Sequence, residues 1–302
     1  MSASLPDPPS GSSGSPISSA TPTRRPSGTP VRDALQGAVT AITAAGCETP
    51  RLDAEVLLAH VLGVGREQLL IDRELHVAGP AVRAFQDAVR RRAVLREPVA
   101  YIVGHRGFHR IDLAVDPRAL IPRPESELLV EWGLELPSGA RVLDVGTGSG
   151  AIALALAQER PDLEVCGSDL SEDALSLARE NAERLGLDVH FLRADLLDGL
   201  DEGFDAVLAN LPYVTEGERV TLAPEILRHE PPGALFAGAD GLDAIRALTE
   251  QLASRADVRH VALEVGTGQA AEVARLCEAA GFEKVGFVPD LAGIERVVKG
   301  ER

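Results

Sequence analysis

Four consecutive residues in the second half of the chain combine groups that could hold a planar nitrogen for reaction. Asn210, Leu211, Pro212 and Tyr213 follow the apolar segment FDAVLA, which predicts that they stand at the end of a buried strand. The lone pair of an amide or amino nitrogen is delocalised, so a group transfer to it requires orientation and acceptors for its hydrogens. The side-chain oxygen of Asn210 and the Leu211 carbonyl can accept these hydrogen bonds, while Tyr213 packs on the planar group. The alternative is a plain Asn-x-Pro turn with a half-buried tyrosine.

A glycine-rich turn earlier in the chain is typical of a nucleotide site. The segment LDVGTGSGAIALALA predicts a strand, a tight turn and a helix whose N-terminal N–H groups face a ligand. Asp169 ends the next predicted strand, where a carboxylate could accept both ribose hydroxyls of a bound nucleoside. The alternative is a glycine-rich turn of any α/β fold. The turn contains Gly146, Thr147, Gly148, Ser149 and Gly150.

The glycine spacing alone leaves the cofactor open. A dinucleotide fingerprint takes glycines at its first, third and sixth positions, and Ala151 could stand for the sixth. Asp144 before the turn and Gly150 within it are more typical of methyltransferases that use S-adenosylmethionine, which we expect as methyl donor. No metal is expected, because none is required if the proton leaves the nitrogen after transfer. Leu196, after Asp195, is where such enzymes flank the adenine, and a leucine there is equally well explained by the core.

The elements that must position these residues fall into successive segments. Residues 1–30 are dominated by Ser, Pro and Gly, which predicts a disordered tail. Residues 31–97 carry apolar residues at three- and four-residue steps, which predicts a small helical domain. Residues 98–118 shift toward alternation with glycines between, which predicts a β-hairpin linking two domains.

Residues 119–302 are expected to form the catalytic domain. Strand-like and helix-like segments alternate from Arg141 onward, which indicates a mostly parallel sheet covered on both faces. Two prolines flank Arg123 and forbid a helix there, so a stiff loop should lead into a helix from about Ser126. Arg123 could contact substrate or cofactor, and an exposed loop arginine is the alternative. The expected fold is α/β, with a Rossmann-like class I methyltransferase sheet and an N-terminal helical domain joined by the hairpin.

Length and composition narrow the class of protein. With 302 residues, 45% of them hydrophobic, the chain can build a real core. Its longest apolar runs fall short of the roughly 20 residues that cross a bilayer, and its N-terminus lacks a secretion signal, so we expect a cytoplasmic protein without membrane association. The net charge of -16 argues against extended contact with nucleic acid. Three separated cysteines predict neither a disulfide framework nor a zinc site.

Dispersed segments carry a resemblance to one family: RLDAEVLLAHVLG, EPVAYIVG, LIPRPESELLVE, LDVGTGSGAIALALA, NLPY, HEPPGALFAGADGLDAIR and DLAGIERVV. From about Val31 to its end, the chain resembles the peptide chain release factor N5-glutamine methyltransferases, the PrmC/HemK family. The resemblance implies methyl transfer from S-adenosylmethionine to the glutamine amide of a Gly-Gly-Gln motif in class 1 release factors, in support of translation termination. It implies that residues 210–213 hold that amide, with Asn210 also beside the cofactor. We expect release factors as partners, engaged partly by the helical domain, and a monomeric enzyme.

Leu211 departs from that family, which usually has Asn-Pro-Pro-Tyr. The carbonyl is retained and Pro212 still favours an extended conformation before it, so we expect function to survive. Ser126 stands where the family usually has Thr, which conserves a hydroxyl.

Other functions remain in competition. Asn-Leu-Pro-Tyr is also found in rRNA adenine dimethylases, so an adenine-N6 methyltransferase acting on nucleic acid is the second hypothesis. A flipped base presents a planar amino group much as glutamine does. A nicotinamide-binding oxidoreductase would explain the glycine turn and leave residues 210–213 unexplained. A non-catalytic binding module is the remaining alternative if Leu211 spoils the pocket.

Overall fold

The computed structural model describes residues 1, 28–72 and 75–302. Most of the predicted N-terminal tail therefore lies outside the described residues. The last two residues of the predicted disordered tail are ordered instead, because Thr29–Pro30 forms the short strand β1. This strand pairs antiparallel with β2 (His76–Val77) and fastens the start of the chain to the helical domain.

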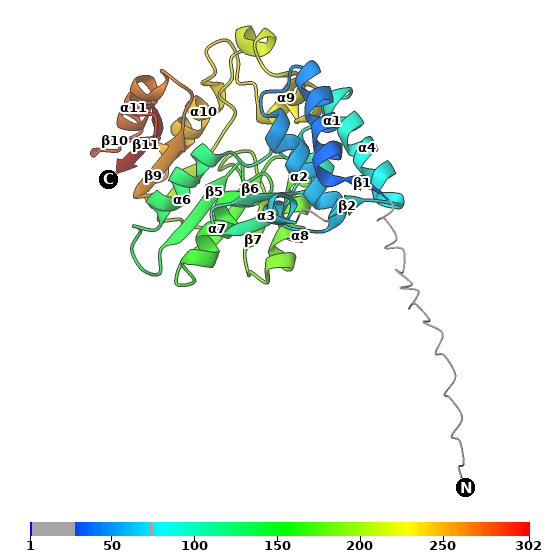
Figure 1. The fold of residues 1–302 in the computed structure, drawn as a ribbon. Helices are drawn as coiled ribbons and strands as arrows, with labels where there is room; N and C mark the ends of the chain where they lie inside the picture. Colours follow the sequence, from blue (N-terminus) through cyan, green and yellow to red (C-terminus); the bar gives the residue numbers. More distant parts are fainter. Residues whose placement is uncertain (2–27, 73–74) are drawn as a thin grey trace.

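The N-terminal domain is a helix bundle, as its apolar periodicity predicts (Figure 1). Ile42, Leu58 and Phe85 from three helices meet in one core. Among all helices of the described residues, none combines the length and apolar character needed to cross a membrane. The helices of this domain are α1 (Val31–Ala44), α2 (Pro50–Leu62), α3 (Arg66–Ile71) and α4 (Pro80–Ala93).

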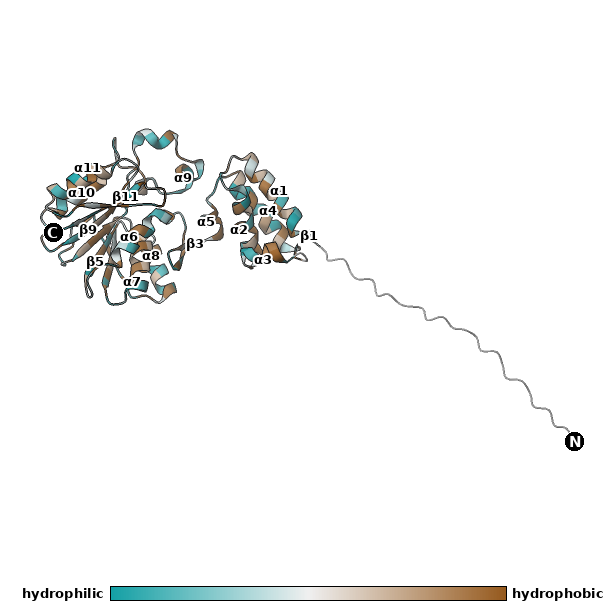
Figure 2. Cartoon of the chain, turned by 60° about the vertical axis from the view of Figure 1, so that its left-hand side comes forward, coloured by the Kyte–Doolittle hydropathy of each residue, from teal (hydrophilic) through white to brown (hydrophobic). Residues whose placement is uncertain are grey.

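A short helix and a hairpin join the two domains, and Figure 2 shows α5 and β3 lying between them. The hairpin occupies only part of residues 98–118, because Val99–Val103 forms helix α5 rather than a strand. Pro98 precedes the first turn and Gly104 ends it in a left-handed conformation. Strands β3 (His105–Phe108) and β4 (Ile111–Ala114) then pair antiparallel.

One buried side chain ties this hairpin to the larger domain. Asn181 accepts a hydrogen bond from the Ala114 N–H at 2.7 Å and donates to the Ala114 carbonyl at 3.0 Å. The same amide nitrogen donates to the carbonyl of Ser149 at 3.0 Å. The hairpin is thereby fixed to the glycine-rich turn.

A seven-stranded sheet forms the centre of the larger domain, in the order β10-β11-β9-β8-β5-β6-β7. Strands β9, β8, β5, β6 and β7 run parallel, which confirms the predicted mostly parallel sheet. β11 runs antiparallel to both of its neighbours. Its segment ERVVKGE is mostly charged, so its sequence does not predict a strand. The strands are β5 (Arg141–Val145), β6 (Glu164–Asp169), β7 (His190–Arg193), β8 (Ala206–Ala209), β9 (His260–Glu264), β10 (Gly286–Pro289) and β11 (Glu295–Glu301).

Helices cover both faces of the sheet. Successive side chains of a strand point to opposite faces, so Val142 packs with α6, α7 and α8 while Leu143 packs with α10 and α11. Strands buried on both faces appear in the sequence as continuous apolar runs. A 3-10 turn, η1 (Pro124–Ser126), precedes α6. The helices are α6 (Glu127–Gly133), α7 (Ala151–Glu159), α8 (Glu172–Leu185), α10 (Asp243–Leu252) and α11 (Ala270–Ala279).

Residues 210–242 form a long excursion between β8 and α10. Val214 and Leu235 close its base through a backbone hydrogen bond of 2.9 Å. Its helix α9 lies against the N-terminal domain (Figure 1), and the imidazole of His229 is 2.9 Å from the Leu95 carbonyl. The excursion contains η2 (Glu216–Val220), α9 (Pro224–His229) and η3 (Pro232–Ala234).

Buried ion pairs fasten α9 to the helical domain. Arg92, which is 5% exposed, donates to Asp53 at 2.6 Å and to Glu225 at 3.0 Å. Arg96 donates to the other oxygen of Glu225 at 2.6 Å. Because a buried charge without a partner is strongly unfavourable, these groups hold the two domains in one arrangement.

Replacing Arg92 by alanine should lower the free energy of unfolding by about 3 kcal/mol, because buried Asp53 would lose its arginine partner and half-buried Glu225 would keep only Arg96. The matched control is Arg90→Ala on the same helix, which removes an exposed ion pair with Asp87. Its expected loss is below about 1 kcal/mol. Urea unfolding followed by circular dichroism measures both variants, and equal losses would contradict this role for Arg92.

Candidate active site

The carboxyl ends of the central strands open into a cavity of about 570 Å³. β5 and β8 are neighbours, with Val145 paired to Ala209, so the segments that follow them lie side by side. Ligands of parallel sheets bind at this edge, and the volume suits a nucleoside-sized molecule. Of the residues predicted for the site, Arg123, Gly146, Thr147, Gly148, Ser149, Asp169, Leu196, Asn210, Leu211 and Pro212 line the cavity.

The glycine-rich turn lies directly against the residues after β8. Gly146 has a φ of 71°, and a Cβ there would come within 3.0 Å of the Leu211 side chain. Glycine is therefore favoured by the left-handed conformation, and any side chain would also press on Leu211. Gly150 begins α7 and stays behind the cavity wall, so its contribution is to the shape of the turn.

Asp144, in β5, stabilises the glycine-rich turn through hydrogen bonds. Its carboxylate accepts hydrogen bonds from the Thr147 hydroxyl at 2.7 Å and from the Ala153 N–H at 3.2 Å. Burial raises the pKa of Asp144 to about 7, against the opposing effect of these two donors. Its second oxygen has no partner among the described residues, and neither has the buried hydroxyl of Ser168, a residue that lines the cavity.

Asp169, at the end of β6, presents a half-satisfied carboxylate to the cavity. It accepts the N–H groups of Gly148 and Ser171, each at 2.9 Å. Burial raises the pKa of Asp169, and the N–H donors lower it. A carboxylate can accept about four hydrogen bonds, so two ribose hydroxyls could still be bound.

Leu196 lies on the same cavity and also packs against the core beside the sheet. The core interpretation is confirmed, and contact with an adenine stays a prediction that the place of Leu196 on the cavity allows. Its φ of 57° is unusual for a residue with a branched side chain. Such strain is often found at ligand sites, where surrounding structure enforces it.

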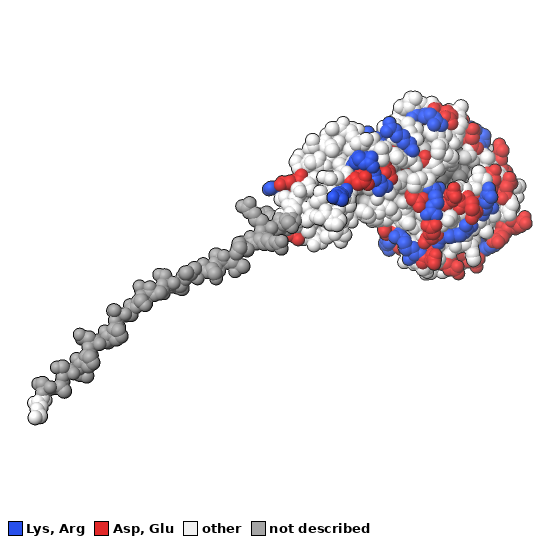
Figure 3. Space-filling model, turned by 90° about the vertical axis from the view of Figure 1, so that its right-hand side faces the viewer, with Lys and Arg blue, Asp and Glu red and all other residues white. Residues whose placement is uncertain are grey.

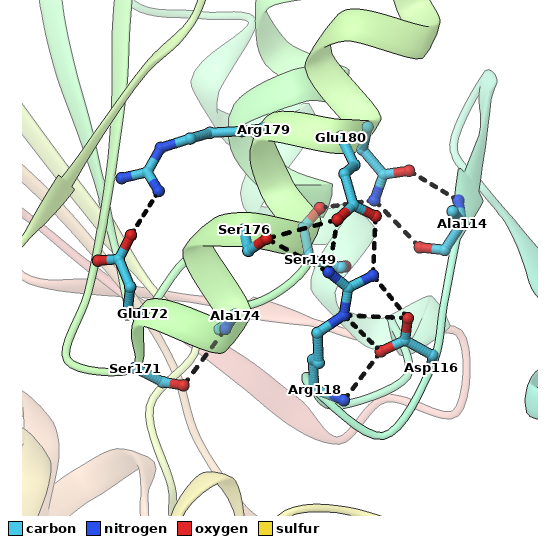
Figure 4. A network of polar contacts seen from close by, with 11 residues as sticks. Ala114, Asp116, Arg118, Ser149, Ser171, Glu172, Ala174, Ser176, Arg179 and Glu180 are labelled. Atoms are coloured by element: carbon cyan, nitrogen blue, oxygen red, sulfur yellow. Dashed lines mark hydrogen bonds and ion pairs between the residues drawn. The ribbon is translucent and has the colours of Figure 1, made fainter.

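An ion-pair network supports the cavity wall nearest to the hairpin (Figure 4). Arg118 lines the cavity and donates to Asp116 at 2.7 Å and to Glu180 of α8 at 2.6 Å. The sequence does not predict this role for Arg118, because its partner Glu180 is distant in the chain. The network fixes the loop after β4 against the helix that follows Asp169.

Arg123 forms a second bridge across the cavity rim. One of its terminal nitrogens contacts both oxygens of Glu230, at 2.7 and 2.8 Å. Glu230 is buried, directly follows α9 and also accepts the Ile121 N–H at 3.3 Å. Arg123 is therefore an ion-paired residue of the site rather than a free loop arginine.

Asn210, Leu211 and Pro212, the residues directly after β8, form a further part of the cavity wall. The Asn210 amide donates to the Ser126 hydroxyl at 2.8 Å, and the Leu211 side chain is buried in the core. Tyr213 lies beside the cavity rather than on its lining, and its hydroxyl donates to Glu264 at 3.4 Å. Burial raises the pKa of the Tyr213 phenol, so it stays protonated.

The support of Tyr213 comes from residues that local patterns do not predict. The side-chain nitrogen of Gln269 donates to the carbonyls of Tyr213 at 3.1 Å and Asp240 at 3.2 Å. Gly241 has a φ of 75°, and a Cβ there would fall 2.2 Å from the Tyr213 carbonyl oxygen. In the sequence, the two glycines of GADGLD are the feature that could have indicated this close contact with Tyr213. Within residues 28–72 and 75–302, no group of three or more His, Cys, Asp or Glu is placed to hold a metal ion.

The same fold occurs in a solved structure of low sequence identity. The hMettl16 catalytic domain in complex with the MAT2A 3'UTR hairpin 6 superposes with a TM-score of 0.52 at 16% identity. The match covers 73% of this chain and 81% of that one. It shows the fold alone.

Similarities in sequence extend over nearly the whole chain. Residues 33–104 match the PrmC N-terminal domain, and residues 136–281 match a methyltransferase domain. The release factor glutamine methyltransferase of Deinococcus radiodurans is 41% identical over 276 residues, covering 90% of this chain and 98% of the relative. The protein of the same name from Rhodospirillum rubrum is 41% identical, covering 85% and 81%. The chain belongs to the release factor glutamine methyltransferase family.

Proposed function

We propose that this protein transfers a methyl group from S-adenosyl-L-methionine to the side-chain amide N5 of glutamine in the Gly-Gly-Gln motif of class 1 peptide chain release factors. The transfer would take place in the cytoplasm and support translation termination. One observation carries the proposal: Asn210, Leu211 and Pro212 line the same nucleoside-sized cavity as Asp169 and the glycine turn. The names of the relatives support glutamine as the acceptor.

The residues of the cavity fit the methyl donor. Asp169 retains acceptor capacity for two ribose hydroxyls, and Leu196 offers an apolar surface to the adenine. The turn at residues 146–149 offers polar groups to the amino-acid part. When bound, S-adenosylmethionine supplies a methyl carbon made electrophilic by its sulfonium.

The residues after β8 can orient the acceptor nitrogen. The Asn210 side-chain oxygen and the Leu211 carbonyl accept the two amide hydrogens, which aims the nitrogen lone pair at the methyl carbon. In the transfer that this arrangement would favour, the nitrogen would gain the methyl group as the donor's methyl–sulfur bond breaks, and it would then lose one proton to solvent. Leu211 in place of the family's proline leaves the required carbonyl unchanged.

Adenine-N6 methylation of nucleic acid is the second candidate, because Asn-Leu-Pro-Tyr occurs in enzymes of that kind. The charge distribution argues against it. Figure 3 shows acidic and basic side chains interspersed over the larger domain on the face drawn, without a continuous basic band among its described residues. Nucleic-acid binding requires such a surface to release counterions from phosphates.

The first prediction of this proposal concerns the acceptor. Incubating an unmethylated release factor with this protein and S-adenosylmethionine should add one methyl group to the glutamine of the Gly-Gly-Gln peptide, measured by mass spectrometry. Asn210→Ala should slow the transfer by about 100-fold or more, because one acceptor for the amide hydrogens is lost. Gln158→Ala is the matched control, since it removes an exposed amide from α7. Methylation of RNA or DNA without methylation of the release factor would favour the adenine hypothesis.

The second prediction concerns the donor. Asp169→Ala should weaken S-adenosylmethionine binding by about tenfold or more, because hydrogen bonds to a charged acceptor contribute about 1.5–3 kcal/mol each. Asp188→Ala, at an exposed position, should leave the affinity unchanged. Calorimetric titration measures both dissociation constants. Wild-type affinity in Asp169→Ala would remove Asp169 from the cofactor site.

A further inference from the structure

We propose that Ser126 and Glu264 are positioning residues that fix the direction of the Asn210 amide, so that its oxygen rather than its nitrogen faces the reacting group. The inference rests on the proposed function and assigns roles to two residues beyond the segment 210–213. Three side chains from separate elements form one hydrogen-bonded relay. The Asn210 nitrogen donates to the Ser126 oxygen at 2.8 Å, and the Ser126 hydroxyl donates to Glu264 at 2.6 Å.

The direction of the relay follows from the number of protons available. An ionised carboxylate only accepts hydrogen bonds, so Glu264 takes the single hydroxyl proton of Ser126. The Ser126 oxygen can then only accept, and its partner must be the amino group of Asn210. The amide oxygen of Asn210 is thereby turned away from Ser126 and left for the substrate. A flipped amide would place two oxygens together without a proton and would offer donors to a substrate nitrogen that is itself a donor.

Burial makes this direction strict. Ser126 is 4% exposed and Glu264 is 1% exposed. In such surroundings a mismatched hydrogen bond is unfavourable, because water cannot replace the missing partner. Glu264 also accepts the Tyr213 hydroxyl at 3.4 Å, so one carboxylate contacts both ends of the segment 210–213 through Ser126 and Tyr213.

The relay should depend on pH, since burial raises the pKa of Glu264 to about 7. A protonated Glu264 can donate to Ser126, whose own proton can then turn to Asn210 and permit the flipped amide. The groups that face Glu264 are the hydroxyls of Ser126 and Tyr213, the carboxylate of Glu125 and the guanidinium of Arg296. The Glu125 charge raises the pKa of Glu264 and the Arg296 charge lowers it. The turnover number should therefore fall as the pH drops through about 7.

Kinetics of the serine variants test the relay through a conservative rescue. Ser126→Ala should lower kcat for glutamine methylation on the order of tenfold, because the amide is no longer held in one orientation. KM for the release factor and the dissociation constant of S-adenosylmethionine should match those of Ser254→Ala, which removes one exposed hydroxyl hydrogen bond. Tm should fall in Ser126→Ala, because buried Glu264 and the Asn210 nitrogen lose their partner. Ser126→Thr should restore kcat. Wild-type kcat in Ser126→Ala would overturn the proposal.

The variant Glu264→Gln shows whether the pH dependence of kcat comes from Glu264 or from another titrating group. Asp144 is one such group, because its pKa also lies at about 7. Glu264→Gln can still accept the Ser126 proton through its amide oxygen, and it does not titrate. The fall in kcat on the acid side of pH 7 should therefore disappear in this variant. An unchanged acid limb would show that Glu264 does not control the amide.

A spectroscopic measurement tests the relay without any catalytic assay. The chain contains only two asparagines, Asn181 and Asn210, so selective ¹⁵N-asparagine labelling gives two side-chain amide signals. The Asn210 signal should shift with pH around 7 in the wild type and lose this response in Ser126→Ala and Glu264→Gln, while the Asn181 signal stays constant. An Asn210 signal insensitive to pH and to both substitutions would refute the relay. Failure to methylate the release factor with the expected NMR response would refute the proposed function alone.

Discussion

The parallel pairing of β5 and β8 at the centre of the sheet is the constraint on which the site depends. It brings the end of β5, which carries the glycine turn, against the end of β8, which carries Asn210. The two segments approach so closely that a Cβ at Gly146 would lie 3.0 Å from the end of the Leu211 side chain. A cofactor bound by the turn and an acceptor held after β8 would therefore meet across a very short distance, which in-line transfer requires.

Around this centre, three buried or half-buried carboxylates perform different tasks according to their partners. Asp144 receives donors from the turn itself and keeps its shape. Asp169 is half satisfied by main-chain N–H groups and retains acceptor capacity toward the cavity. Glu264 receives hydroxyl protons and faces no ligand directly. The carboxylate thus stabilises the turn in Asp144, can accept ligand hydroxyls in Asp169, and in Glu264 fixes the direction of the hydrogen bonds from Ser126.

The sequence predicts the parts of the molecule that depend on local pattern. β5 and β8 are buried along nearly their whole length and are followed by Gly146 and Asn210, and β6 ends at Asp169, so the centre of the sheet and these cavity-lining residues follow from the local pattern. β11 escapes prediction because its segment is mostly charged, and α5 because its five residues are too few to show a helical period. Ser126, Glu264, Gln269 and Arg118 act through partners more than 50 residues away, and no local pattern contains that information.

Helix α9 connects the interface between the domains directly to the rim of the cavity. Its first turn carries Glu225, held by arginines of the helical domain, and its last residue is followed by Glu230, which grips Arg123. Six helical residues span about 9 Å and resist compression and bending. A tilt of the helical domain that carries α9 with it would therefore also displace Glu230 and, through it, Arg123 at the cavity rim.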